Sequence, residues 1–502
     1  MENKLQLNDS QVPLLSGYRS HDCPPWRPKL SEVVTEVREL YHIAFPLIIS
    51  SLLTYGKSTI SLAFMGHLGK EALAGGSLAI SFANITGYSV LSGLAMGMDA
   101  ISSQAFGAKQ WTLMGQTLQR TIIILLLCCL PISVLWLNIK PIFILVGQDP
   151  SICTVAETYI TYCLPDLVLM SLTSPLKIYL RSQQVTHPLM LSAAVGLLFH
   201  FPVNYLMVTC LGLGIRGVAI ATWIMDLNIL LIMILYILVT KTHKKTWQGW
   251  SMECFKGWSI ILSLAIPSCI SVCLEWWWYE LMIVLSGLLP NAADKVATMG
   301  ILIQATSLVY IFPSSLSLAV STRVGNELGG GQPTKAKTSS NISISCAIAT
   351  SILALSFSVT FRNIWGRAFT SDEAIIALTA STMPVLGLCE LGNCPQTTMC
   401  GVLRGSARPK LGANINLGSF YGVGLPIAIL MGFYLKMGLF GLWVGLLAAQ
   451  AACSIFMAVM LMTTDWAFEA QRAKELTGCA NNVVNEDVNN NNEVDENHEI
   501  NG

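Results

Sequence analysis

Residues 121–138 have the sequence TIIILLLCCLPISVLWLN, a run of 18 residues without a charged side chain. A helix rises about 1.5 Å per residue, so a run of this length covers most of a hydrocarbon core roughly 30 Å thick. Apolar and polar residues do not alternate along it, as they would in the strands of a membrane barrel. The run therefore predicts a transmembrane helix.

Comparable apolar blocks recur along the whole 502-residue chain, which is 53% hydrophobic and only 12% charged. A soluble domain is nearer to 25% charged. The blocks predict an all-α polytopic membrane protein. We expect twelve transmembrane helices, at residues 40–64, 73–101, 118–138, 154–176, 187–208, 214–239, 258–288, 296–322, 341–360, 374–397, 411–434 and 439–462.

Composition and motifs exclude several other classes of protein. The formal net charge is zero, so the charge balance does not favour a nucleic-acid partner. The 15 cysteines lie mostly in apolar blocks without metal-ligand spacing, which indicates small buried hydrophobic side chains rather than a metal site. No phosphate-binding G-x-x-x-x-G-K-[ST] motif and no catalytic His, Asp and Ser constellation is present. We predict no cofactor and no enzyme.

Polar segments define the expected domains. Most of the 29 Lys and Arg residues lie in the tails or in loops after even-numbered spans, which places both termini in the cytoplasm because basic segments remain on that side. The Asn-, Asp- and Glu-rich C-terminal tail cannot bury a core and is expected to be largely disordered. The predicted segments are an N-terminal tail 1–38, an N-lobe 39–240, an inter-lobe loop 241–257, a C-lobe 258–463 and a C-terminal tail 464–502.

The two halves of the chain repeat one another. Ala44-Phe45-Pro46 in the first predicted span corresponds to Ala265-Ile266-Pro267 in the seventh, and Leu180-Arg181 corresponds to Leu403-Arg404. Further matches follow in the same order at a near-constant offset of about 220 residues. Six spans per half preserve orientation, so we expect two pseudo-symmetric six-helix lobes around a central cavity, related by an axis along the membrane normal. Pro46 and Pro267 occupy matching places, and both hinges and static kinks fit that placement.

Ionisable residues inside the spans are the candidates for function, because a charge there costs at least a few kcal/mol. The seventh span contains Glu275-Trp276-Trp277-Trp278-Tyr279-Glu280. A buried carboxylate there can take up and release a proton, and the aromatic side chains can bind an organic cation or a planar solute. Glu275 shares a helix face with Tyr279, whereas Glu280 points about 140° away from Glu275. An interfacial aromatic belt and a helix-packing acid are the structural alternatives.

Two further spans carry polar residues that suggest a site. In the tenth span Glu390, Asn393 and Gln396 follow at intervals of three residues and form a polar stripe, so Glu390 is a second candidate proton carrier. In the first span Lys57 lies deep enough to face a cavity or a partner acid, and Asp99 near the end of the second span is one candidate partner. A structural ion pair fits Lys57 equally well. Asp166 and Asp226 are weaker candidates for function in the fourth and sixth spans.

The chain resembles the multidrug and toxic compound extrusion (MATE) family of transporters, in particular its plant branch. The resemblance covers roughly residues 38–465. The motifs that carry it are Met65-Gly66-His67-Leu68-Gly69, Gln104-Ala105-Phe106-Gly107-Ala108, Glu275-Trp276-Trp277, Arg323-Val324-Gly325-Asn326-Glu327-Leu328-Gly329 and Gly401-Val402-Leu403-Arg404-Gly405. It implies two six-helix lobes and exchange of organic solutes for H⁺ or Na⁺.

The same resemblance suggests roles for individual residues. Glu275 falls on the acid that eukaryotic members use for proton coupling. Asn393 stands where many members have an acid, with Glu390 one turn earlier, and Gln304 stands where some animal members have a glutamate. The first span lacks the aspartate of many prokaryotic members and carries Lys57 nearby. Coupling through the C-lobe is therefore expected.

We predict a secondary active efflux transporter, an antiporter that exchanges protons for small organic solutes or xenobiotics by alternating access. Glu275 and Glu390 are the predicted proton carriers, with H⁺ favoured over Na⁺. The predicted cargo contacts are Trp276, Trp277, Trp278, Tyr279, Glu280, Asn393, Gln304 and Lys57. We expect a monomer in the plasma, vacuolar or endosomal membrane. A membrane sensor on a transporter fold and a lipid-type flippase are the alternatives.

Overall fold

The computed structural model describes residues 29–478, and nearly all of that part of the chain is helical. The N-lobe contains α1 (Leu30–His67), α2 (Lys70–Ala83), η1 (Asn84–Tyr88), α3 (Ser89–Ala95), α4 (Gly97–Gly107), α5 (Trp111–Leu137), α6 (Ile139–Leu145), α7 (Pro150–Ser182), α8 (His187–Asn204), η2 (Tyr205–Cys210) and α9 (Ile215–Thr240). The short helices η3 (Thr242–Lys245) and η4 (Met252–Phe255) lie in the inter-lobe loop.

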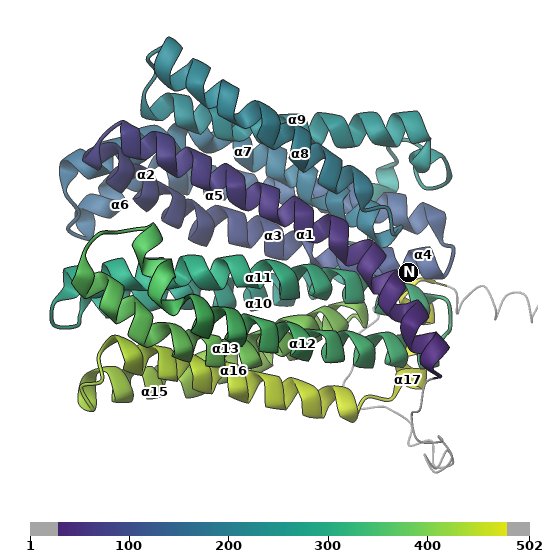
Figure 1. The fold of residues 1–502 in the computed structure, drawn as a ribbon. Coiled ribbons are helices and arrows are strands. Elements are labelled where there is room, and N and C mark those ends of the chain that lie inside the picture. Colours follow the sequence, from purple (N-terminus) through teal and green to yellow (C-terminus); the bar gives the residue numbers. More distant parts are fainter. Residues whose placement is uncertain (1–28, 479–502) are drawn as a thin grey trace, which may run out of the picture.

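The C-lobe follows with α10 (Trp258–Gly287), α11 (Ala292–Gly329), α12 (Pro333–Trp365), η5 (Gly366–Ala368), α13 (Glu373–Gly405), α14 (Pro409–Asn416), η6 (Leu417–Gly424), α15 (Leu425–Ile429), η7 (Leu430–Tyr434), α16 (Leu439–Met462) and α17 (Trp466–Leu476). Figure 1 shows the two lobes side by side, α1–α9 in purple to teal and α10–α17 in green to yellow. The start of α1 and helix α17 lie at the same end of the molecule, here called the terminal end.

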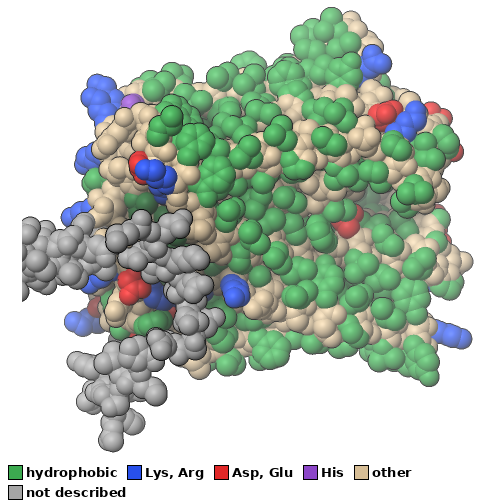
Figure 2. Space-filling model, turned by 180° about the vertical axis from the view of Figure 1, so that it is seen from behind, with side chains coloured by type: hydrophobic (Ala, Val, Ile, Leu, Met, Phe, Trp, Pro, Cys, Tyr) green, Lys and Arg blue, Asp and Glu red, His purple; other side chains and the backbone are tan. Residues whose placement is uncertain are grey.

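The prediction of twelve membrane-spanning helices is confirmed within residues 29–478. The outer surface forms an apolar belt with charged side chains toward its two ends, as Figure 2 shows for one face. Large apolar side chains such as Leu130, Leu198, Leu235 and Leu353 are exposed there. Such a belt suits contact with lipid tails and would be unstable in water. Several helices extend beyond the predicted spans; α1 begins at Leu30 and runs for 38 residues.

The backbone bears out the internal repeat. Gly214 and Gly438 precede α9 and α16 with φ, ψ of 56°, −132° and 61°, −134°. A side chain is strained at such positive φ, so only glycine suits these two matching positions. A π-helical segment leads to each glycine, η2 in the N-lobe and η7 in the C-lobe. The predicted pseudo-symmetry of the lobes is therefore present in local conformation as well as in sequence. Pro46 and Pro267 both lie inside helices, α1 and α10.

The two lobes pack closely against each other in the part of their interface nearer to the terminal end. A Cβ added at Gly93 would lie 2.5 Å from Cα of Cys269, and one added at Gly97 would lie 2.5 Å from Cβ of Ala265. Small residues four positions apart thus allow the N-lobe backbone to pack directly on α10, the usual device for close helix contact in membranes. Further along the interface, the Gln104 side-chain amide donates a hydrogen bond of 2.9 Å to the Gly405 carbonyl.

Candidate functional site

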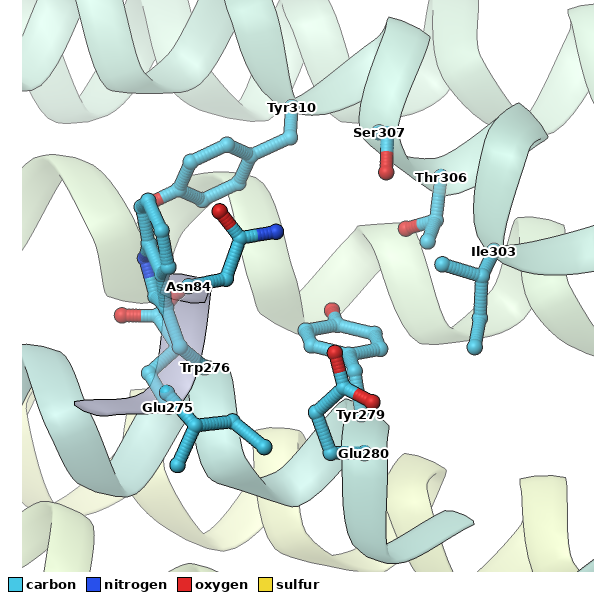
Figure 3. A pocket seen from close by; sticks show the side chains of 10 residues that line it. Asn84, Glu275, Trp276, Tyr279, Glu280, Ile303, Thr306, Ser307 and Tyr310 are labelled. Carbon is cyan, nitrogen blue, oxygen red and sulfur yellow. The ribbon is translucent and has the colours of Figure 1, made fainter. Parts of the chain in front are cut away.

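A cavity of about 270 Å³ lies on the C-lobe side of the lobe boundary. Helix α10 supplies one wall, helix α11 another, and the π-helical turn η1 of the N-lobe completes the lining. Figure 3 shows the side chains of α10 facing those of α11 across the space. The lining residues are Asn84, Ile85, Glu275, Trp276, Tyr279, Glu280, Ile303, Thr306, Ser307 and Tyr310.

Of the two carboxylates that line this cavity, Glu275 is the one with an unpartnered buried oxygen atom. Its Oε1 atom is fully buried without a hydrogen-bond partner among the described residues. The Tyr310 hydroxyl hydrogen-bonds to the carboxyl group, and Arg404 is the cation that acts on it. A buried oxygen without a donor is costly when charged, and binding a proton removes that charge. The site can therefore exchange a proton with the cavity.

Arg404 connects the Glu275 site to the lobe interface. Its guanidinium donates a hydrogen bond of 2.8 Å to the Ser317 hydroxyl of α11, and another nitrogen lies 3.3 Å from the sulfur of Met96, an N-lobe residue. The Nε atom of Arg404 is buried without a hydrogen-bond partner in the described part of the chain. One side chain thus contacts α11 and the opposite lobe while it acts electrostatically on Glu275.

The three consecutive tryptophans lie in different surroundings. Trp276 is 37% exposed and lines the cavity together with Tyr279. The Trp277 indole donates a hydrogen bond of 3.2 Å to the Ile85 carbonyl, across the lobe boundary. Trp278 is 1% exposed and packs inside the C-lobe against Phe420. The structure therefore brings Trp276 and Tyr279 to the cavity wall, and not Trp277 or Trp278.

Glu280 also lines the cavity, although the helical wheel places it far from the direction of Glu275. Both acids line the cavity, and Ser81 of the N-lobe hydrogen-bonds to Glu280. Gln304 is not part of the lining; its side-chain carbonyl accepts a hydrogen bond of 2.9 Å from the Tyr55 hydroxyl of α1. Gln304 therefore joins the two lobes.

Glu390 lies behind the cavity wall and is 1% exposed. Its carboxylate accepts hydrogen bonds of 2.5 Å from the Thr306 hydroxyl and 2.9 Å from the Asn393 amide. Thr306 lines the cavity and also hydrogen-bonds to Tyr279. The predicted pair of Glu390 and Asn393 is thus assembled, and Thr306 connects it to the cavity in which Glu275 lies.

A second, larger cavity of about 380 Å³ lies in the N-lobe and shares Asn84 and Trp276 with the first. Lys57 lines it and forms an ion pair with Asp226 of α9. Asp166 accepts a hydrogen bond of 2.7 Å from the Tyr88 hydroxyl. The remaining polar lining consists largely of hydroxyl groups and one further lysine, namely Thr54, Ser58, Ser61, Tyr159, Thr173, Ser174, Thr222 and Lys177.

The predicted pairing of Lys57 with Asp99 is wrong. Asp99 is fully buried in α4, 2.8 Å from the Arg181 guanidinium, and its other oxygen accepts a hydrogen bond of 2.8 Å from the Ser321 hydroxyl of the C-lobe. Arg181 is nearer because it lies at the same end of the bundle as Asp99, whereas Lys57 lies farther along α1. Asp99 therefore contributes to contact between the lobes, and Asp226 neutralises Lys57.

Sequence reasoning missed several contributors to the two cavities. Lys177 falls one residue beyond the predicted fourth span, 154–176, but α7 continues to Ser182 and places Lys177 in the N-lobe cavity. Asn84 lines both cavities because the helix widens to a π-helical turn at that point, a feature often found at functional sites. Tyr310 carries no sequence pattern that distinguishes it from other aromatic residues in the spans.

Comparison with known proteins gives consistent matches. A family model described as MatE matches residues 46–206 and 267–430. Protein DETOXIFICATION 49 of Arabidopsis thaliana is 56% identical over 456 residues, 91% of this chain and 91% of that protein. Protein DETOXIFICATION 48 of the same plant is 54% identical over 478 residues, 95% of this chain and 90% of that protein. The crystal structure of the eukaryotic MATE transporter AtDTX14 matches with a TM-score of 0.86 at 32% identity, covering 89% of this chain and 100% of that one.

Proposed function

The chain belongs to the MATE family of multi-pass membrane transporters, and we propose that it exports small organic solutes in exchange for protons, with Glu275 as the principal proton carrier. The observation that supports this role is the buried Oε1 atom of Glu275, which has no hydrogen-bond donor among the described residues and lies at a cavity of ligand size. A carboxyl group with these surroundings changes its interactions most when it gains or loses a proton.

The proposed exchange has two states of the Glu275 carboxyl group. When deprotonated, it holds a negative charge beside Arg404 and in contact with Tyr310. When protonated, it no longer attracts the guanidinium of Arg404, so the side chains that line the cavity rearrange and the cargo is released. Glu390 is the proposed second proton carrier, reached through Thr306 and Tyr279. Because a ligand that binds two states differently shifts their populations, one proton can drive the exchange.

Alternating access would follow from separation of the lobes at their close contact. Here the lobes touch through Gly93, Gly97 and α10, while Figure 2 shows the surface hollowed toward the end of the molecule opposite the terminal end. The basic inter-lobe loop supports a cytoplasmic location for the terminal end. With that orientation the cavities open toward the outside.

The test is solute uptake into proteoliposomes under an imposed pH gradient. Wild type and Glu275→Gln are compared, with Glu253→Gln as the control because Glu253 lies in the inter-lobe loop, outside both cavities. We expect wild type and the control to accumulate solute only with the gradient, and Glu275→Gln to lose at least tenfold of that uptake. Equal gradient-driven uptake by Glu275→Gln would remove Glu275 from the mechanism, and uptake driven only by Na⁺ would contradict proton coupling.

A further inference from the structure

The N-lobe cavity contains a lysine that takes part in no ion pair with the described residues. Lys57 is paired with Asp226, and Asp166 is bonded to Tyr88. Lys177 lines the same cavity, yet no carboxylate of the described residues lies within 4.0 Å of its ammonium group. An ammonium group carries three hydrogen-bond donors, so Lys177 can bind an acceptor that enters the cavity.

The two acids of this cavity are engaged by other groups. Asp226 lies in the ion pair with Lys57, and one oxygen of Asp166 accepts the hydrogen bond from Tyr88. Neither carboxylate lies within 4.0 Å of the Lys177 ammonium group. Lys177 is therefore the cationic group of the cavity that remains open to an anionic ligand.

The surroundings of Lys177 suit an oxygen-rich anionic group. Hydroxyl groups of Ser58, Thr173 and Ser174 line the same cavity and can donate hydrogen bonds to an anion. The Lys177 ammonium group lies in a half-buried site and has no carboxylate of the described residues within 4.0 Å. A buried charge is costly unless a counter-ion accompanies it. A carboxylate fits both requirements because it offers two acceptor oxygens and one negative charge.

The rest of the ligand must lie toward the lobe boundary. Asn84 and Trp276 line both cavities, so the two spaces adjoin at these residues. Trp276 presents an indole that is 37% exposed, and aromatic faces bind flat apolar groups by stacking. Together the cavities, about 380 and 270 Å³, are of the size that holds small organic ligands.

We propose that the N-lobe cavity is an anion subsite for the transported solute, in which Lys177 binds the carboxylate of an amphipathic organic acid whose flat apolar body lies against Trp276. The inference rests on the proposed function, because it takes the ligand to be the exported solute. It names a class of cargo that the carboxylates of the C-lobe alone would disfavour.

The test measures binding to the purified full-length protein by isothermal titration with three probes that share one ring system. The probes are 2-naphthoate, 2-naphthamide and 2-naphthylmethylammonium. We expect 2-naphthoate to bind at least tenfold more tightly than either other probe, since a charged hydrogen bond contributes at least that factor. This comparison uses wild-type protein alone, so it does not depend on the folding of any variant. Tighter binding of the ammonium probe, or no binding of 2-naphthoate, would overturn the inference.

Variants assign the subsite to Lys177. Lys177→Gln is expected to bind 2-naphthoate about tenfold more weakly while its affinity for 2-naphthamide changes less than twofold, and Lys177→Arg is expected to keep most of the affinity for the anion. Lys410→Gln removes an exposed positive charge outside both cavities and serves as the control. Unchanged 2-naphthoate affinity in Lys177→Gln would contradict the assignment. If binding follows the expectation while wild type shows no gradient-driven uptake, the anion subsite stands and the proton-coupled mechanism fails.

Discussion

Substitution of Gly97 by alanine should weaken the contact that closes the lobes against each other. A Cβ at this position would lie 2.5 Å from Cβ of Ala265 and 2.6 Å from its backbone nitrogen. Carbon atoms in favourable contact lie about 3.5–4.0 Å apart, so the two helices must separate by roughly 1 Å. Overpacking of this kind costs about 1–3 kcal/mol, and the cost falls only on the arrangement in which the lobes touch here. The population of that arrangement should therefore fall by roughly 5- to 150-fold relative to the opposite one.

The assay is a distance measurement between spin labels on the two lobes at the terminal end. Lys244→Cys, in η3 directly after the last N-lobe helix, and Lys335→Cys in the C-lobe are both exposed positions. The exposed native Cys210 is replaced by serine. Gly97→Ala should move the distance distribution to longer values. The control is Gly300→Ala, a helical glycine whose added Cβ meets no atom within 4 Å. If both variants give the wild-type distribution, the lobes do not pack as closely at Gly97 as the structure indicates.

Three further predictions concern stability, each followed as the melting temperature of the purified protein. Lys57→Met should lower the free energy of unfolding by about 3 kcal/mol, because it leaves Asp226 unpaired in a largely buried site. Lys57→Met combined with Asp226→Asn should recover most of the loss. An equally unstable double variant would contradict the pairing. Asp149 caps α7, and the hydrogen bonds that it accepts from Ser151 lower its pKa. Its stabilising effect should therefore be present at neutral pH and disappear as the pH falls through its folded-state pKa. A constant difference in melting temperature between wild type and Asp149→Ala at all pH values would exclude this effect. Gly214→Ala should cost about 1–2 kcal/mol because φ is 56° there, and an unchanged melting temperature would show that the turn relaxes freely.

The sequence predicted the fold well because membrane helices are specified by local composition. An apolar run such as residues 121–138 has few alternatives in a bilayer, where backbone groups must be bonded within the segment. Helix ends were predicted less well. Polar residues continue the helices beyond the hydrocarbon region, and for that reason Lys177 lies within α7 rather than after it. Because the predicted helix end was a few residues too early, Lys177 could not be recognised as a charged group of the N-lobe cavity.

The site could be predicted only where its residues are neighbours along one helix. Glu275 and Tyr279 lie one turn apart on α10 and indeed line one cavity. Partners on different helices could not be found in this way. Lys57 meets Asp226 rather than Asp99, because the choice depends on how far along α1 and α9 each side chain lies in the assembled bundle. The burial of Trp278 likewise depends on Phe420, which lies in another helix of the C-lobe.

Arg404 contacts Met96 of the opposite lobe and also acts on the carboxyl group of Glu275. In the proposed mechanism, separation of the lobes would remove the Met96 contact and leave the guanidinium free to reorient. The affinity of Glu275 for its proton would then differ between the closed and the separated arrangement. Thermodynamic reciprocity requires that the proton change the equilibrium between the two arrangements by the same factor. Under this proposal, one arginine would couple the external pH to the side of the membrane that the cavities face.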